Sequence, residues 1–194
     1  MEYPLALSFK VSALAPQLSV TDANGKLVLY VKQKLFKLRE EVTVFADAEQ
    51  TQPLYQIDAD RVLDFSARYR FTDLDDSNLG SVRREGVKSL WRAYYDICDG
   101  DAVVMTIREK NPWVKMLDGL FSLIPLVGWF SGYVFHPTFL LSRPDGKIVM
   151  RLEKQPAFFE DQFTLSKQTE LSEEEEKRAL LGLLMMILLE RTRG

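Results

Sequence analysis

SEEEEKRALLGLLMMILLERTR, residues Ser172 to Arg193, is the stretch of this 194-residue chain that decides its fold. Ser172 and Glu175 have the spacing of a helix capping box, and four consecutive glutamates stand where the helix dipole favours negative charge. Arginines near the other end carry the sign that the last turn prefers. The stretch therefore predicts a helix over residues 173–192.

The middle of this predicted helix has no polar face. Ala179 to Leu189 carries no polar side chain, so every side of the helix should be buried. A membrane span needs roughly 20 apolar residues, and this run is too short, which favours a core helix over a membrane anchor. Burying a large apolar side chain contributes about 1.5 to 3 kcal/mol. The rest of the chain is therefore expected to wrap around this helix.

The composition indicates one domain, residues 1–194, with its core over residues 18–193. Hydrophobic residues make up 46% of the chain, which is enough for a sizeable interior. The net charge of −3 gives no electrostatic case for nucleic acid as a partner. Cys98 is the single cysteine, so neither an internal disulfide nor a cysteine-built zinc site is expected.

The start of the chain and the cysteine usage together indicate a location. MEYPLALSFK lacks the basic-then-apolar layout of a secretory signal peptide. One unpaired cysteine suits a reducing compartment. We expect a cytoplasmic protein, or one that is peripheral to the inner face of a membrane.

Most segments before the helix are predicted to be β-strands. Leu63 to Phe71 is the clearest, because apolar and polar side chains alternate along it with a period of two. Asn24-Gly25 is typical of a tight hairpin turn. Residues 1–17 are mixed in character and interrupted by two prolines, so no strand is assigned to them. Because closure removes exposed sheet edges, about ten to twelve short strands should form a closed β-barrel around the helix.

Two polar clusters invite a functional interpretation. Asp73 to Gly80 is rich in acidic residues, but Arg84 stands where a calcium-binding EF-hand needs glutamate, so we predict a hairpin turn and no metal site.

A basic cluster close to Trp91 and two tyrosines has the composition of an anion site. The alternative is an ordinary strand with its arginines on the wet face. The predicted lipid- or anion-binding residues are Arg83, Arg84, Lys88 and Arg92.

Residues 113–135 do not fit a simple barrel. Gly119 to Phe135 carries no charged residue, whereas Pro125 and two glycines argue against one uninterrupted helix. Three structures remain open: a helix and turn that covers one end of the barrel, an interfacial element that dips into a membrane, and a span. An exposed apolar patch usually marks a contact site. The predicted membrane or partner contacts are Trp113, Leu123, Leu126, Trp129, Phe130 and Tyr133.

The chain carries no residue pattern that supports catalysis. His136 is the single histidine, and no serine or cysteine nucleophile motif lies near it. No glycine-rich phosphate-binding loop follows a strand, so no cofactor is expected. Cys98 has Asp99 and Asp101 as neighbours, which should raise the pKa of its thiol. We expect a protein that is not an enzyme.

Three stretches carry a resemblance to a known family. They are VKQKLFKLREEVTVFADAEQTQPLYQIDADRVLDFSARYRFTD from Val31 to Asp73, LGSVRREGVKSLWRAYYDI from Leu79 to Ile97, and the apolar C-terminal helix. They resemble the LURP-one-related family, which shares a fold group with the tubby C-terminal domain and the phospholipid scramblases. The resemblance implies a barrel of about twelve strands around a central hydrophobic helix. Tubby-like domains bind phosphoinositide headgroups, and scramblase-like proteins associate with membranes.

Two hypotheses about function follow. The first is a non-enzymatic module that associates with a membrane surface, with a lipid or a phosphoinositide-like anion as its partner. The second is a soluble scaffold whose apolar segment packs on its own barrel or on a protein partner. Salt dependence separates them, because headgroup binding through cations weakens as ionic strength rises, whereas apolar packing does not.

Overall fold

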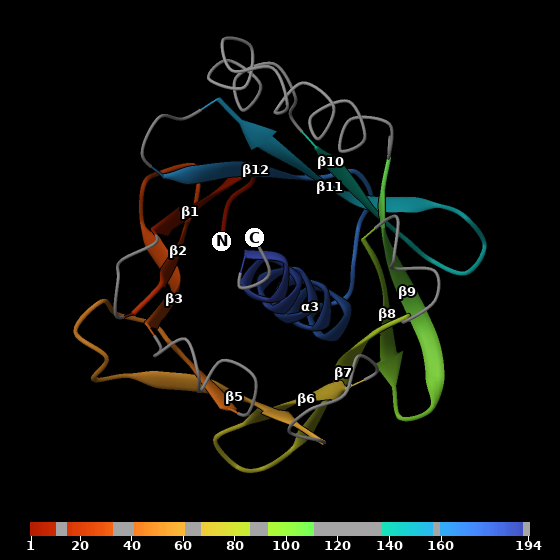
Figure 1. Ribbon diagram of the computed structural model, residues 1–194, viewed down its shortest axis with the longest axis horizontal. Helices are drawn as coiled ribbons and strands as arrows, with labels where there is room; N and C mark the ends of the chain where they lie inside the picture. Colours follow the sequence, from red (N-terminus) through yellow and green to blue (C-terminus); the bar gives the residue numbers. More distant parts are fainter. Residues whose placement is uncertain are drawn as a thin grey trace, which may run out of the picture.

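A computed structural model describes residues 1–10, 15–32, 41–60, 67–85, 93–110, 137–156 and 160–191 of the chain. In these residues twelve antiparallel strands form a closed barrel, and one helix, α3 (Glu173–Arg191), lies inside it (Figure 1). The fold predicted from the sequence is confirmed. The strands are β1 (Leu5–Lys10), β2 (Gln17–Thr21), β3 (Leu27–Lys32), β4 (Glu41–Phe45), β5 (Pro53–Ala59), β6 (Arg68–Asp73), β7 (Asn78–Arg84), β8 (Tyr94–Asp99), β9 (Ala102–Glu109), β10 (Thr138–Ser142), β11 (Ile148–Gln155) and β12 (Asp161–Lys167).

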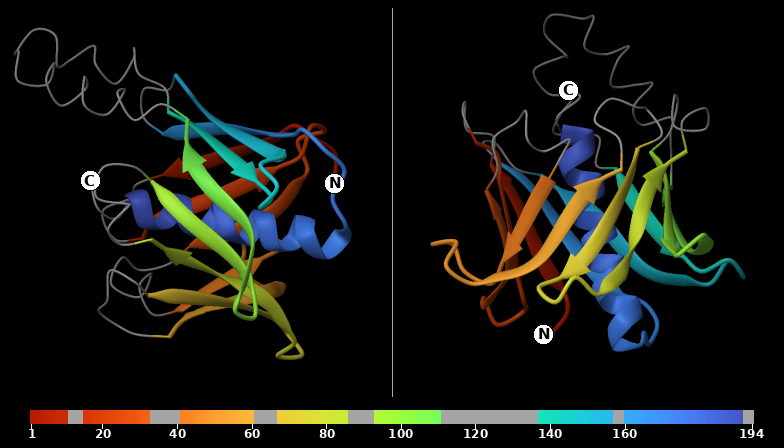
Figure 2. Two further views of the ribbon diagram at one scale, coloured as in Figure 1. Left: turned by 90° about the vertical axis from the view of Figure 1, so that its right-hand side faces the viewer. Right: turned by 90° about the horizontal axis from the view of Figure 1, so that it is seen from below.

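The barrel has a simple up-and-down topology. Each strand pairs with its neighbours in the sequence, and β1 closes the barrel by pairing with β12. Because successive strands alternate in direction, the β2–β3, β4–β5, β6–β7, β8–β9 and β10–β11 turns all lie at one end, together with the β12–α3 connection. We call this the turn end. The helix starts at the turn end and finishes at the opposite end, which we call the rim (Figure 2).

Helix α3 begins with the capping box that the sequence predicts. The Glu175 backbone N donates to Ser172 Oγ at 3.2 Å, and the Ser172 backbone N donates to Glu175 Oε2 at 3.0 Å. Arg143, in the β10–β11 turn, donates to both carboxylate oxygens of Glu175 at 3.0 Å. The local cap therefore also attaches the helix to the barrel wall.

The body of α3 has no solvent-exposed side. Every residue from Arg178 to Leu188 is buried, which confirms the predicted core helix. The helix packs closest to β7 and β8. At Gly182 it approaches the wall so tightly that an added Cβ would lie 2.6 Å from Ile97 Cδ1. Among the described residues, no helix is long and apolar enough to cross a membrane.

Arg178 is the charged exception within the buried part of α3. Its Nε donates to the Leu79 carbonyl at 2.7 Å, and its Nη2 contacts Asp99 at 3.0 Å. Gly80 leaves room for this guanidinium group, since a Cβ there would lie 2.6 Å from Arg178 Nε, and its φ of +121° also favours glycine. The buried charge is thus paired and hydrogen-bonded to the wall.

The first strand is the main difference from the sequence analysis, which assigned no strand to residues 1–17. Leu5, Leu7 and Phe9 are buried on alternate positions, and β1 pairs in register with both β12 and β2. Pro4 lies just before the strand, where it removes no ladder hydrogen bond. Residues 5–10 do alternate between apolar and polar side chains, but the run is short. One of the two strands that pair with it, β12, lies more than 150 residues away in the sequence. The predicted strand over 63–71 is confirmed only from Arg68, because residues 61–66 lie outside the described part.

Candidate functional site

The two predicted contact regions are attached to neighbouring strand ends at the rim. Residues 86–92 join β7 to β8, and residues 111–136 join β9 to β10; both lie outside the described residues. The flanking strands are adjacent, because β8 pairs with β7 and β9, and β9 pairs with β10. Backbone hydrogen bonds continue this order past the strand ends, from Glu85 N to Tyr94 O at 3.1 Å and from Lys110 N to Thr138 O at 2.8 Å.

Arg83 lies on the outer wall of the barrel. Its Nη2 donates to Asp96 Oδ2 at 3.2 Å and lies 3.5 Å from Glu85 Oε1. Partial burial is the largest single effect and opposes the charged form, but the hydrogen bond to Asp96 and the charges of the neighbouring acidic groups together outweigh it and raise the pKa of Arg83. The Arg83 side chain remains 35% exposed, so it is reachable from solvent.

Arg84 points the other way, into the rim, because consecutive residues of a strand face opposite sides of the sheet. Its Nη2 lies 3.7 Å from Glu190 Oε1 in the last turn of α3, and its guanidinium group lies 5.9 Å from the Tyr95 ring centre. The Tyr95 hydroxyl donates to the same Glu190 oxygen at 2.7 Å. Burial, reinforced by Glu190, raises the pKa of Tyr95, so this phenol stays protonated and donates.

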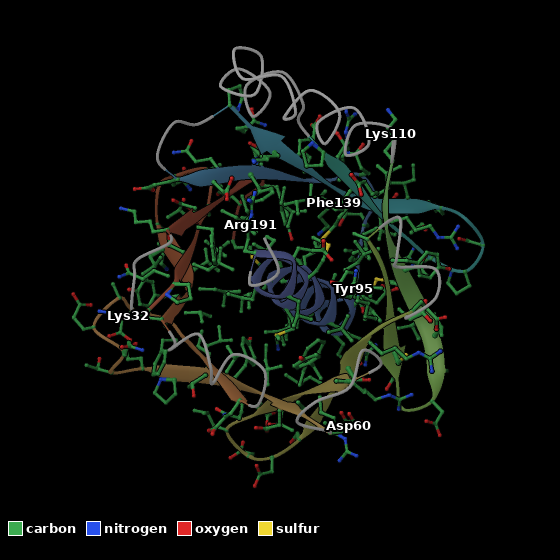
Figure 3. All side chains as sticks on the ribbon, in the orientation of Figure 1. Lys32, Asp60, Tyr95, Lys110, Phe139 and Arg191 are labelled. Atoms are coloured by element: carbon green, nitrogen blue, oxygen red, sulfur yellow. The ribbon has the colours of Figure 1, made fainter. Side chains whose placement is uncertain are left out.

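A second contact ties the end of α3 to the wall. Arg191 Nη2 contacts Asp161 Oδ1 at 2.7 Å, and Lys154 Nζ contacts the same oxygen at 2.9 Å. The Arg191 guanidinium group lies 5.8 Å from the Phe163 ring centre. Figure 3 shows Tyr95 and Arg191 beside the end of the helix. The sequence indicated the arginine but not its partners, which lie on β12.

The rest of the predicted contact set lies outside the described residues. This applies to two of the four basic residues and to all six apolar and aromatic contacts, so their roles stay predictions. The other two basic residues, Arg83 and Arg84, are described, and their side chains lie on opposite faces of β7. The residues outside the described part are Lys88, Arg92, Trp113, Leu123, Leu126, Trp129, Phe130 and Tyr133.

Arg68 is a residue that the sequence analysis missed. It lies directly across from Arg83 in the β6–β7 register, and its Nη1 contacts Asp101 Oδ1 at 3.2 Å. Cys98 is fully buried near these groups. Burial is the main reason that the pKa of the Cys98 thiol is raised, and Asp101 is a lesser one. The predicted rise in the pKa of Cys98 is confirmed. Its main cause is burial, which the neighbouring residues in the sequence did not reveal.

The acidic β6–β7 connection forms the predicted hairpin turn. The Asp73 carboxylate accepts backbone N–H groups from Asp75 at 3.0 Å and from Ser77 at 2.8 Å. Its oxygens therefore organise the turn itself. In the part of the chain that the structure describes, no group of three or more metal-ligating side chains comes together.

Comparison with known proteins supports the assignment made from the residues. A model of the LURP-one-related family matches residues 27–166, from the start of β3 into β12. The X-ray structure of a protein from Arabidopsis thaliana aligns with 97% of this chain and 91% of its own, at 18% identity and a TM-score of 0.51, which shows a common fold. No curated protein matches the chain. Since the family model covers well over half of its residues, this chain belongs to the LURP-one-related family.

Proposed function

We propose that this protein is a non-enzymatic module that associates with an anionic membrane surface through its rim. One observation carries the proposal: a basic region, residues 83–92, and an apolar region, residues 113–135, which carries no charge from Gly119 onward, are joined to adjacent strands at the same end of the barrel. Stable peripheral binding usually needs two such signals, because neither an apolar insertion nor a few cations suffices alone.

The contacts of Arg83 and Arg84 indicate how the free energy of membrane binding would divide between the cations and the apolar side chains. Arg83 already contacts Asp96, and Arg84 lies near Glu190. A headgroup phosphate would have to compete with these carboxylates. The apolar side chains within 113–135 would therefore supply most of the affinity, and the cations would select for anionic lipid and confer salt sensitivity.

Vesicle sedimentation tests the proposal. The intact protein should bind vesicles that contain phosphatidylserine, bind them less at high salt, and bind neutral phosphatidylcholine vesicles weakly. The double variant Leu123→Glu/Leu126→Glu should lose most of this binding, because it places two charges in the apolar contact.

A matched control adds the same charges at the opposite end. Leu74 and Ile148 are 64% and 41% exposed at the turn end, so Leu74→Glu/Ile148→Glu should fold normally and leave vesicle binding nearly unchanged. Equal losses in the two double variants would contradict a contact at the rim. If the intact protein binds no vesicle, the proposal is wrong, and the soluble scaffold with a protein partner becomes the better hypothesis.

A further inference from the structure

We infer that the barrel docks end-on, with the axis of α3 steep to the membrane, the rim toward it and the turn end away from it. The inference rests on the proposed membrane association and adds an orientation to it. It is carried by the charges of described residues at the turn end, together with the length of the barrel.

The turn end is strongly acidic. Every one of its five hairpin turns, and the connection into α3, places carboxylates at this end, whereas its basic residues are few and one of them, Arg143, is held by Glu175. Many of the carboxylates are exposed. The exposed acidic residues are Glu49, Asp75, Asp76, Asp99, Asp101, Asp145, Glu170, Glu173 and Glu174, of which Asp99, Asp101, Glu170 and Glu173 also contact a cation.

The two ends are far enough apart to respond to a charged surface independently. Helix α3 has 19 residues and connects the two ends, which corresponds to about 28 Å at 1.5 Å per residue. The Debye length at physiological ionic strength is about 8 Å. With the rim at an anionic surface, the acidic turns are therefore screened from it. In the inverted orientation they would lie within the repulsive field.

In the described part of the outer wall, several cations lie beside carboxylates, which weakens the attraction for a side-on orientation. Several of its cations contact carboxylates directly, such as Arg151, which lies 2.7 Å from Glu153, whereas Arg108 donates to the Tyr94 hydroxyl at 2.8 Å. Arg83 and Asp96 form a second such ion pair. The carboxylates beside these wall cations reduce the net charge that an anionic surface would attract, so we expect the acidic turn end to dominate the orientation.

Site-specific fluorescence quenching tests the orientation. Cys98 is fully buried, so a thiol-reactive fluorophore can be directed to an introduced cysteine, with the unsubstituted protein as the labelling control. Leu74→Cys places the label at the turn end, and Pro156→Cys places it next to the end of β11 at the rim. Both positions are exposed, and neither substitution changes the net charge.

The labelled proteins are bound to phosphatidylserine vesicles that carry a headgroup nitroxide quencher. The label at residue 156 should be quenched several-fold more than the label at residue 74. Equal quenching would overturn the end-on orientation, and stronger quenching at residue 74 would reverse it; in both cases the proposed membrane association would stand. Failure of the unlabelled protein to sediment with the vesicles would overturn both proposals.

Discussion

Glu175 is the residue at which local and tertiary structure meet. It completes the capping box with Ser172 and also receives the guanidinium group of Arg143. The hydrogen bond from Arg143 is the main reason that the pKa of Glu175 lies below its usual value of 4.5, followed by the bond from the Ser172 backbone. A carboxyl group whose pKa is lower in the folded state stabilises the protein above its unfolded pKa, and this contribution is lost as the pH falls through the folded pKa.

Glu175→Gln should therefore lower the free energy of unfolding by about 1 to 2 kcal/mol at pH 7, in the range observed for the loss of a helix cap. The difference from the unsubstituted protein should shrink as the pH falls below about 4.5, where the native carboxylate also becomes protonated. Urea unfolding at a series of pH values measures both quantities. Glu174→Gln, an exposed change in the same turn, is the control and should have little effect. A difference that is independent of pH would contradict this account.

At the scale of elements, the seating of α3 against β7 and β8 depends on Gly182. Glycine in the middle of a helix normally costs about 1 kcal/mol relative to alanine, so its presence needs a tertiary reason. The structure supplies one, because a Cβ at this position would lie 2.6 Å from Ile97 Cδ1 and 3.0 Å from its Cγ1. Close approach of the helix to the wall outweighs local helix propensity here.

Gly182→Ala should destabilise the protein by about 1 to 3 kcal/mol, despite the better helix former, because Ile97 must move or the helix must shift. Ile97→Val removes the Cδ1 atom that the new methyl group would meet. In a double-mutant cycle measured by chemical denaturation, the two changes together should cost less than the sum of the single changes. A Gly182→Ala variant that is more stable than the unsubstituted protein would show that the helix has room to move.

At the scale of the whole molecule, the barrel and its helix are one cooperative unit. The core cluster draws side chains from all twelve strands and from α3, so the wall has no separate interior to bury. Leu184, in the middle of α3, is 1% exposed. The strands enclose the helix, and side chains from both fill the interior.

Leu184→Asp should abolish the folded barrel. An unpaired carboxylate in this interior costs several kcal/mol, which is comparable with the total stability of a domain of about 5 to 15 kcal/mol. Near-ultraviolet circular dichroism and thermal unfolding measure the outcome, with Leu184→Met as the control that conserves volume. Soluble Leu184→Asp protein with an unchanged thermal transition would disprove the central role of the helix.

The candidate site could be predicted only in part. The basic composition around Arg83 and Arg84 is visible in the sequence, whereas their separation onto opposite faces follows from strand alternation together with the exact strand boundaries. Arg68 was not predicted because it is opposite Arg83 only through the β6–β7 register. Glu190 was not predicted as a partner because it approaches Arg84 from the far end of the chain.

The sequence by itself determined that an apolar helix is enclosed by a closed set of antiparallel strands. That conclusion needs only short-range information, since a helix without a polar face must be buried and strands with a period of two must bury one face. Tertiary structure alone decided that β1 closes the barrel by pairing with β12, that Gly182 seats the helix against Ile97, and which carboxylates hold Arg84, Arg143 and Arg178. Each of these contacts joins residues that are distant in the chain, and their pairing depends on the register of the whole barrel, which no local pattern contains.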